Sequence, residues 1–517
     1  MAEIDKEIEV GAVDLRGSTM AKNVFLNILG IGIPYLVGFV TIPFIIKGMG
    51  LERFGILSLI WVVIGYFGLM DLGLSRATTK YVAEALGEGR LERIPEFVGT
   101  TITLQGGLGL LGTTVLIVFT PFVVEKLLNI PELLLGEVRT SFIILAFSIP
   151  IVLISSSLRG VLEAAQRFDL VNFVKIPVSA SFYVLPLVGL AIGFRLPGII
   201  GLLILPRIVS MLVWGRNYTR LFSQCSAKWI FRRSLIKSLL SFGGWVSLSS
   251  IVYTIANSID RFIIGSLRTV RELSYYTAPQ EVVTKFGIIP GSLSLILFPA
   301  FSSLNGGGQE ERSKVFYVRS LKYIFMCTGP IALFFVFYAK SFLHIWLGSD
   351  FSINSSLILQ MLSLVFLITS LSGVPFNYLQ GIGKVAISTQ LQIGELIFFL
   401  PLAILMIKHW GIRGAAIALG LKTLLLTSAL LIVSQRQRRI EKAIWIQTGF
   451  WRSAIANLSG AALLILCSLM GWRLTGAILV LPFLAIVAFY WVLSLQERRL
   501  LIDTLANAFL RLRRKRI

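Results

Sequence analysis

The chain alternates between apolar runs of about 20 residues and short breaks that contain charged residues, Gly or Pro. A helix of ~20 residues, at 1.5 Å per residue, spans the ~30 Å hydrocarbon core of a bilayer. Each run therefore predicts a transmembrane helix, and the predicted fold class is an all-α polytopic membrane protein with about fourteen spans. The expected spans lie near residues 24–46, 54–74, 98–120, 140–162, 172–194, 199–215, 239–264, 279–301, 319–340, 354–380, 390–407, 414–434, 452–470 and 475–495.

These runs form two sets of six, separated by a polar stretch and followed by an additional pair. Because both sets begin on the same side, they predict two six-helix lobes related as a parallel pseudo-repeat around a central cavity. The predicted parts are a cytoplasmic N-terminal segment (1–22), an N-lobe (23–216), a cytoplasmic linker (217–238), a C-lobe (239–435), an extra span pair (436–495) and a basic amphipathic cytoplasmic tail (496–517).

The composition excludes several classes of protein. With 56% hydrophobic residues, 14% charged residues and a mean hydropathy of +0.83, the chain is not a water-soluble domain. Three Cys and two His, all far apart, favour neither a disulfide scaffold nor a metal centre. No Gly-rich phosphate loop and no Ser-His-Asp arrangement occurs, so we expect no catalytic residue and no cofactor.

The distribution of the 48 Lys and Arg residues predicts the orientation. With the N-terminus inside, the cytoplasmic segments carry about three times as many of them as the outer segments, as the positive-inside rule requires. Both termini are therefore expected in the cytosol, in a multi-pass protein of the cytoplasmic (inner) membrane. The same bias explains much of the net charge of +22 without a nucleic-acid partner.

Three stretches carry a family pattern, at residues 50–90, 258–304 and 380–421. The first has Phe54-Gly55 at the opening of the second span and the sequence DLGL (71–74) at its close. Together they resemble the polysaccharide transporter branch of the multidrug/oligosaccharidyl-lipid/polysaccharide exporter superfamily, the Wzx-type flippases of lipid-linked glycans. The resemblance covers roughly residues 20–435 in the order and number of spans.

The resemblance implies alternating-access transport of an undecaprenyl-pyrophosphate-linked oligosaccharide repeat unit to the outer leaflet, for synthesis of a surface polysaccharide such as O-antigen or exopolysaccharide. It also implies coupling to H⁺ or Na⁺, and leaves a polysaccharide polymerase complex open as a further partner. The expected number of fourteen spans resembles that of the lipid II flippases. In those proteins an Asp-Arg pair follows the Tyr-rich start of span eight. Here Pro279-Gln280 follows the sequence YYTA (275–278), which argues against a peptidoglycan precursor as cargo.

A pyrophosphate cargo requires cations within the membrane, because two negative charges cannot otherwise leave water. Arg207 in span six, Lys285 in span eight and Lys422 in span twelve are the candidate substrate-binding residues. A structural ion pair between Lys285 and Glu281, one turn apart, is the alternative for that lysine. For Arg207 and Lys422 the alternative is snorkelling to an interface.

Charged residues of the spans and their ends are the candidates for ion coupling or gating: Asp71, Arg76, Glu84, Asp260, Arg261, Glu281 and Glu395. Asp71, Arg76 and Glu84 lie near the expected cytoplasmic mouth, where a helix cap and a surface pair are the alternative. Asp260 and Arg261 are expected to form an outer latch, and Glu395 is a candidate for proton or sodium coupling, with a buried interhelical hydrogen bond as its alternative.

Two other functions are alternatives to the flippase. A cation-coupled multidrug antiporter on the same fold is disfavoured because span one (24–46) contains no carboxylate. A membrane enzyme of glycan assembly is disfavoured because every expected outer loop is short.

Overall fold

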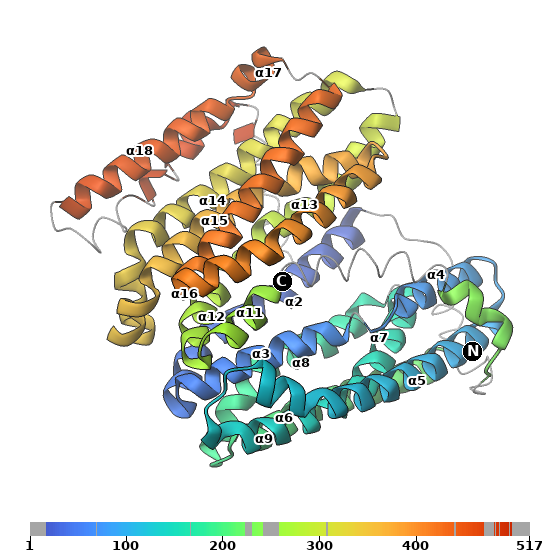
Figure 1. Ribbon diagram of the computed structural model, residues 1–517. Helices are drawn as coiled ribbons and strands as arrows, with labels where there is room; N and C mark the ends of the chain where they lie inside the picture. The colour runs from blue at the N-terminus through green and yellow to red at the C-terminus, as the bar shows by residue number, and fades with distance from the viewer. Residues whose placement is uncertain are drawn as a thin grey trace, which may run out of the picture. The chain divides into compact units, whose positions relative to one another are not determined.

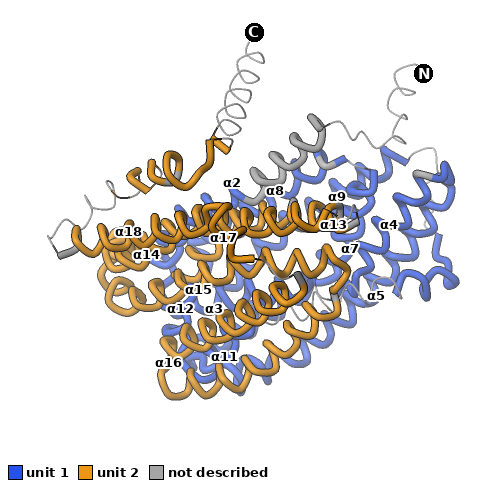
Figure 2. The backbone as a smooth tube through the Cα atoms, turned by 90° about the horizontal axis from the view of Figure 1, so that it is seen from above, with its two compact units in different colours: residues 1–278 blue, residues 279–517 orange. Residues whose placement is uncertain are grey.

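The computed structural model describes residues 17–68, 70–165, 167–222, 230–240, 258–306, 309–438, 441–469, 480, 482–484, 486–495 and 497–498. Within these ranges every regular element is a helix, as Figure 1 shows. The chain divides into two compact units, residues 1–278 and 279–517, which Figure 2 draws in different colours. Each unit is described separately.

The first unit is built mainly of long helices. They are α2 (Gly17–Met49), α3 (Leu51–Phe67), α4 (Leu74–Gly87), α5 (Ile94–Pro121), α6 (Glu132–Ala146), α7 (Ser148–Ala164), α8 (Phe168–Ala191), α9 (Leu196–Leu221), α11 (Ile259–Leu267) and α12 (Val270–Lys285), with a short 3₁₀-helix η1 (Leu91–Arg93) and a π-helix η2 (Phe122–Leu127). The first part of α12 belongs to this unit and its last turns to the second.

Helix α2 shows how these sequences suit a bilayer. Leu36, Val40 and Phe44 recur every four residues and are exposed, so they form one apolar face of the helix for contact with lipid. Gly38 and Gly48 lie against Tyr183 and Leu190 of α8, where a side chain larger than hydrogen would meet these two residues. Small residues at such contacts allow membrane helices to pack closely.

The break between α6 and α7 has a local cause in Pro150. Proline has no N–H, so the carbonyl of Ala146, four residues earlier, loses its helical partner. Thr113 of α5 donates its hydroxyl to that carbonyl at 2.9 Å. Gly109 of α5 leaves the space that Pro150 needs, and α6 and α7 together form one candidate span, Glu132–Ala164.

The second unit continues the helical pattern. Its elements are the end of α12, then α13 (Ile288–Gly306), α14 (Glu310–Leu347), α15 (Ser349–Gly381), α16 (Val385–Arg438), α17 (Lys442–Gln447), α18 (Phe450–Leu469) and the short η4 (Ala488–Val492). The predicted span 279–301 is interrupted between α12 and α13. Gly287 and the missing N–H of Pro290 explain this break.

Helix α16 contains two helices that fold back on each other at Gly411. This residue has a φ of 58° and a ψ of −140°, which favour glycine over any residue with a side chain. A Cβ atom at Gly414 would lie 1.9 Å from the carbonyl oxygen of Met406, so the return is tight. The fold therefore agrees with the two spans predicted at 390–407 and 414–434.

Within the described part of the chain, nine helices are long and apolar enough to cross a membrane. Most of predicted span seven (239–264), part of the final pair and nearly all of the basic tail (496–517) lie outside the described residues. The total of fourteen, the arrangement of the lobes and the predicted domain boundaries accordingly stay predictions. The described part of the chain is all-helical, and the protein is a multi-pass membrane protein.

Candidate functional site

Arg207 is a buried cation in the middle of α9. Only 5% of the residue is exposed. Its Nη1 donates to the hydroxyl of Ser148 at 3.1 Å, while its Nη2 is buried and has no hydrogen-bond partner. The guanidinium carbon lies 4.8 Å from the ring centre of Phe182 on α8.

The surroundings of Arg207 are therefore neutral. Among the described residues no carboxylate lies within 4 Å of its guanidinium group. A hydroxyl and an aromatic face compensate a buried charge only in part. The free Nη2 is a donor that an anionic group could use, and the fork of an arginine suits a phosphate.

Lys422 and Glu395, which the sequence analysis assigned to different roles, face each other across the turn at Gly411. Lys422 Nζ lies 3.6 Å from Glu395 Oε1, and Lys422 is 4% exposed. The same ammonium group lies 4.7 Å from the ring centre of Phe399, one turn beyond Glu395. The two charges form a buried ion pair within the second unit.

Lys285 and Glu281 form an ion pair, which their spacing of four residues had suggested as the alternative to cargo binding by Lys285. Lys285 Nζ donates to Glu281 Oε2 at 2.9 Å in the last turns of α12, and both side chains are almost fully buried. Of the three candidate cations, Lys285 and Lys422 are paired with carboxylates, whereas Arg207 contacts neutral groups.

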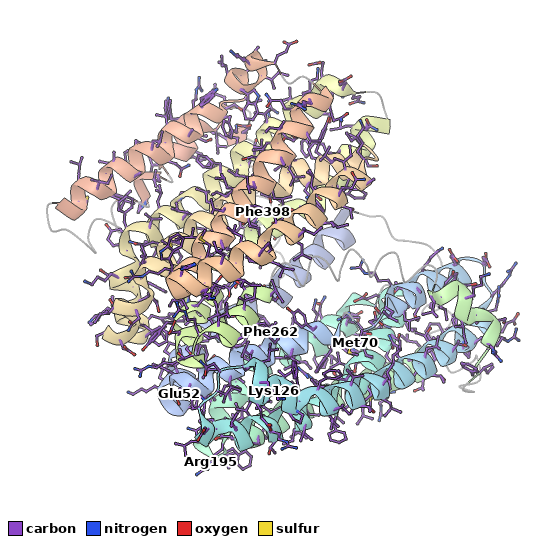
Figure 3. All side chains as sticks on the ribbon, viewed as in Figure 1. Glu52, Met70, Lys126, Arg195, Phe262 and Phe398 are labelled. Atoms are coloured by element: carbon purple, nitrogen blue, oxygen red, sulfur yellow. The ribbon has the colours of Figure 1, made fainter. Side chains whose placement is uncertain are left out.

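Asp71 lies in the turn between α3 and α4 and is buried, with 7% of the residue exposed. Its carboxylate accepts hydrogen bonds from the backbone N–H and the hydroxyl of Ser75, from the Gln105 amide of α5 and from Ser156 of α7. Met70, the preceding residue, is labelled in Figure 3 and lies against Gly112 of α5. The turn thus places an acid among polar side chains from three helices.

Arg76 and Glu84, which the sequence placed near Asp71 at the expected cytoplasmic mouth, are not part of this buried group. Arg76 is exposed, and Glu84 pairs within its own helix, where its Oε1 lies 3.6 Å from Lys80 Nζ. The structure therefore groups neither of them with the buried Asp71 carboxylate, and their role in gating stays a proposal.

Asp260 and Arg261 are both buried near the start of α11. Asp260 accepts a hydrogen bond of 2.7 Å from the Tyr276 hydroxyl of α12. Phe262, labelled in Figure 3, stacks on Tyr66 of α3 with ring centres 5.7 Å apart. This segment is therefore packed on α3 within the first unit.

A further interior charge group was missed by the sequence analysis. Lys322 of α14, which is 1% exposed, donates to both carboxylate oxygens of Glu497 at 2.9 Å. The Tyr323 hydroxyl also donates to Glu497. A lysine four residues into the predicted span 319–340 was the available signal for this group, but its partner lies 175 residues away in the chain.

We expect Glu497 to make the stability of the second unit depend on acid pH. Burial alone would raise the pKa of its carboxyl, but the hydrogen bonds from Tyr323 and Lys322 outweigh burial and hold the pKa below 4.5. Such a group stabilises the fold above its unfolded-state pKa and loses that contribution as the pH falls through its folded-state pKa. Between about pH 6 and about pH 3.5, the thermal unfolding temperature should fall more for the unaltered protein than for Glu497→Gln.

Glu311→Gln is the matched control, because Glu311 is an exposed acid of α14 that pairs with Lys314. It should keep the pH dependence of the unaltered protein. An equal pH dependence in Glu497→Gln would contradict the role given to this carboxylate.

Comparison with known proteins assigns the chain to a family. The model of a family described as polysaccharide biosynthesis protein matches residues 49–356, more than half of the chain. The chain belongs to this polysaccharide biosynthesis protein family. All residues from Asp71 to Lys285 discussed above lie within the matched segment.

Single relatives match a larger share of the chain than the family model does. The chain is 28% identical over 407 residues to a protein of Shigella flexneri named putative O-antigen transporter, and the match covers 79% of this chain and 96% of that one. Among solved structures it resembles the lipid II flippase MurJ in an inward closed conformation (13% identity, TM-score 0.68, covering 91% of this chain and 97% of that one). It also resembles an inward-facing multidrug resistance transporter of the MATE family and MOP superfamily (16% identity, TM-score 0.67, covering 81% and 94%). These two similarities show the fold alone.

Proposed function

We propose that this family member is a flippase for a lipid-linked oligosaccharide, which moves an undecaprenyl-pyrophosphate-linked repeat unit across the cytoplasmic membrane for surface polysaccharide synthesis. The function is transport and not catalysis. The family assignment and the similarity to a putative O-antigen transporter over nearly its whole length support this class of cargo. The multidrug antiporter has only the likeness in fold in its favour.

The observation that carries the proposal is the buried guanidinium group of Arg207. A pyrophosphate that leaves water needs hydrogen-bond donors and positive charge to replace its hydration. Arg207 offers both, because its Nη2 is unused and no carboxylate among the described residues neutralises it. An anionic headgroup would give this side chain the partner that its charge lacks.

Lys285 and Lys422 have a conditional role in this proposal. Each is held by a carboxylate, so contact with cargo requires the phosphate to replace Glu281 or Glu395. A carboxylate released in this way would favour uptake of a coupling cation, H⁺ or Na⁺. This exchange would link cargo binding to ion binding.

The remaining candidates belong to gating. Asp260 and Arg261 would stabilise an outer latch through the packing of α11 and α12 on α3, and Asp71, Arg76 and Glu84 would act at the opposite mouth. This assignment follows the predicted orientation, in which both termini lie in the cytosol. A polysaccharide polymerase complex stays open as a neighbour that would receive the cargo.

Complementation tests the proposed function directly. In a strain that lacks its own oligosaccharide flippase, expression of this chain should restore surface glycan, measured by gel analysis of extracted polysaccharide. Resistance to cationic dyes should not change. Dye efflux without restored glycan would contradict the proposal and favour the antiporter, provided that the strain makes a glycan that the transporter accepts.

A further inference from the structure

Four basic residues of the second unit gather around a single acid, Glu497. The Nε of Arg319 lies 3.9 Å from this carboxylate and the Nζ of Lys322 lies 2.9 Å from it. Arg452 of α18 is close enough to Lys322 to act on it electrostatically, and Arg498 directly follows Glu497 in the chain. Among the described residues, no other carboxylate lies within 4 Å of any of these four cations. The group, called the Glu497 cluster below, therefore carries an excess of positive charge.

The Glu497 carboxylate is already used by its nearest neighbours. It accepts hydrogen bonds from Lys322, from the Tyr323 hydroxyl and from the backbone N–H three residues before it. Lys322 is 1% exposed, and a buried ammonium group requires such a partner. Arg319 and Arg452 are exposed, so they present charge that the protein itself does not neutralise.

Packing within the second unit holds the cluster together. Helices α14 and α18 lie side by side, as Figure 1 and Figure 2 show. Gly449, with a φ of 76°, turns the chain into α18, and a Cβ atom there would lie 3.6 Å from the carbonyl oxygen of Val492 and 3.8 Å from Cδ of Arg452. Arg498 donates to the Leu493 carbonyl, just after η4, at 3.0 Å. The fold thus brings cations from α14, from α18 and from the segment after η4 to one place.

The cluster lies where the lipid-facing surface of α18 begins. This helix is a candidate span from Phe450 to Cys467, and 18 residues at 1.5 Å each cover about 27 Å of the ~30 Å hydrocarbon core. Arg452, in the first turn, is therefore at the boundary between membrane and water. Trp451, Ile455 and Leu458 are exposed on one face of the same helix. Tryptophan is enriched at this boundary, and the aliphatic residues that follow suit acyl chains.

We infer that Arg319 and Arg452 bind the phosphate of an anionic phospholipid such as phosphatidylglycerol, with Lys322 and Arg498 adding to the positive field. Guanidinium groups suit phosphate oxygens, and basic residues at the ends of membrane helices attract anionic lipid headgroups. A zwitterionic lipid fits less well, because it brings a cation of its own to a positive cluster. The acyl chains would lie along the exposed apolar face of α18.

This phospholipid belongs to the surrounding bilayer and differs from the proposed cargo, so the inference stands apart from the proposed function. It is tested on the full chain in a neutral detergent. A saturating amount of phosphatidylglycerol should raise the unfolding temperature by about 3 °C, and an equal amount of phosphatidylcholine should not.

The variant Arg319→Gln/Arg452→Gln should lower the affinity for phosphatidylglycerol at least about tenfold, measured by native mass spectrometry. Because both side chains are exposed, its unfolding temperature without added lipid should stay close to that of the unaltered protein. An undiminished affinity in this variant would overturn the inference, and so would equal shifts with the two phospholipids.

Arg216→Gln/Arg436→Gln is the matched control, because it removes the same charge from exposed positions on α9 and α16. Neither arginine lies within 4 Å of Glu497. The control should keep the affinity for phosphatidylglycerol. An equal loss in the two double variants would indicate an effect of net charge alone and contradict the assigned site.

Two further ligands separate a phospholipid from other sources of phosphate. Inorganic phosphate should give no shift, and geranylgeranyl pyrophosphate should give a smaller shift than phosphatidylglycerol. If either ligand matched phosphatidylglycerol and lost its effect in Arg319→Gln/Arg452→Gln, the phospholipid would be the wrong occupant. Arg207→Ala should bind phosphatidylglycerol normally, because Arg207 belongs to the first unit. Failed glycan complementation with intact phosphatidylglycerol binding would overturn the proposed function and leave this lipid site standing.

Discussion

Arg207→Ala should reduce surface glycan at least about tenfold in the complementation assay, with the protein still present in the membrane. A hydrogen bond to a charged group contributes about 1.5–3 kcal/mol, and 1.4 kcal/mol corresponds to a factor of ten. The protein itself should not be destabilised, because the partners that Arg207 leaves behind, Ser148 and Phe182, are neutral. Glycan is measured by gel analysis and protein by immunoblot of membranes.

Two variants separate the proposed role from a general effect of charge. Arg216→Ala, an exposed arginine on the same helix, should leave export unchanged. Arg207→Lys keeps the charge but loses the planar fork, so it should restore only part of the activity. Normal export by Arg207→Ala, or loss of the protein from the membrane, would contradict a cargo contact at this position.

The second large effect is expected at the pair formed by Glu395 and Lys422. Glu395→Gln or Lys422→Met alone leaves one buried charge without its partner, which costs about 3–5 kcal/mol. The double variant removes both charges, and replacement of a buried pair by neutral groups is often neutral for stability. We therefore expect each single variant to lower the unfolding temperature in detergent strongly, and the double variant to recover most of the loss.

The same single and double variants distinguish a structural role of the pair from a role in transport. If Lys422 also binds cargo, the double variant should recover protein stability but not glycan export. Arg413→Met, an exposed cation close to the turn at Gly411, should change neither quantity. Additive destabilisation in the double variant would show that the two side chains do not stabilise each other.

Much of the fold was accessible from the sequence because the bilayer imposes simple rules. A run of apolar residues of sufficient length can only be a helix in lipid, since every backbone polar group must be satisfied within its own segment. The return of the chain at Gly411 was also marked, by the charged break between two apolar runs. The predicted helix at 279–301 was less accurate, because the Gly and Pro at 287 and 290 interrupt it.

The site was only partly predictable. Intramembrane charges are rare and costly, so Arg207, Lys285, Lys422 and Glu395 stood out from an apolar background. The pair between Lys285 and Glu281 follows from helical periodicity, as residues four apart lie on one face.

Other partners could not be found in this way. Uncharged polar residues such as Gln105 and Ser156 are frequent in membrane helices, and nothing in their local sequence indicates that they face Asp71. The same holds for Lys322, whose carboxylate partner is Glu497.

By itself, the sequence determined the helical class, most of the span positions and the identity of the membrane-embedded charges, because these depend on length, hydropathy and the cost of burying charge. Only the tertiary structure decided which charges are neutralised, since that depends on contacts between helices far apart in the chain. It pairs Lys422 and Lys285 with carboxylates and leaves Arg207 among neutral groups. All three cations are buried, so the difference lies in their pairing, which no local pattern encodes. It singles out the guanidinium group of Arg207 as the candidate contact for an anionic cargo.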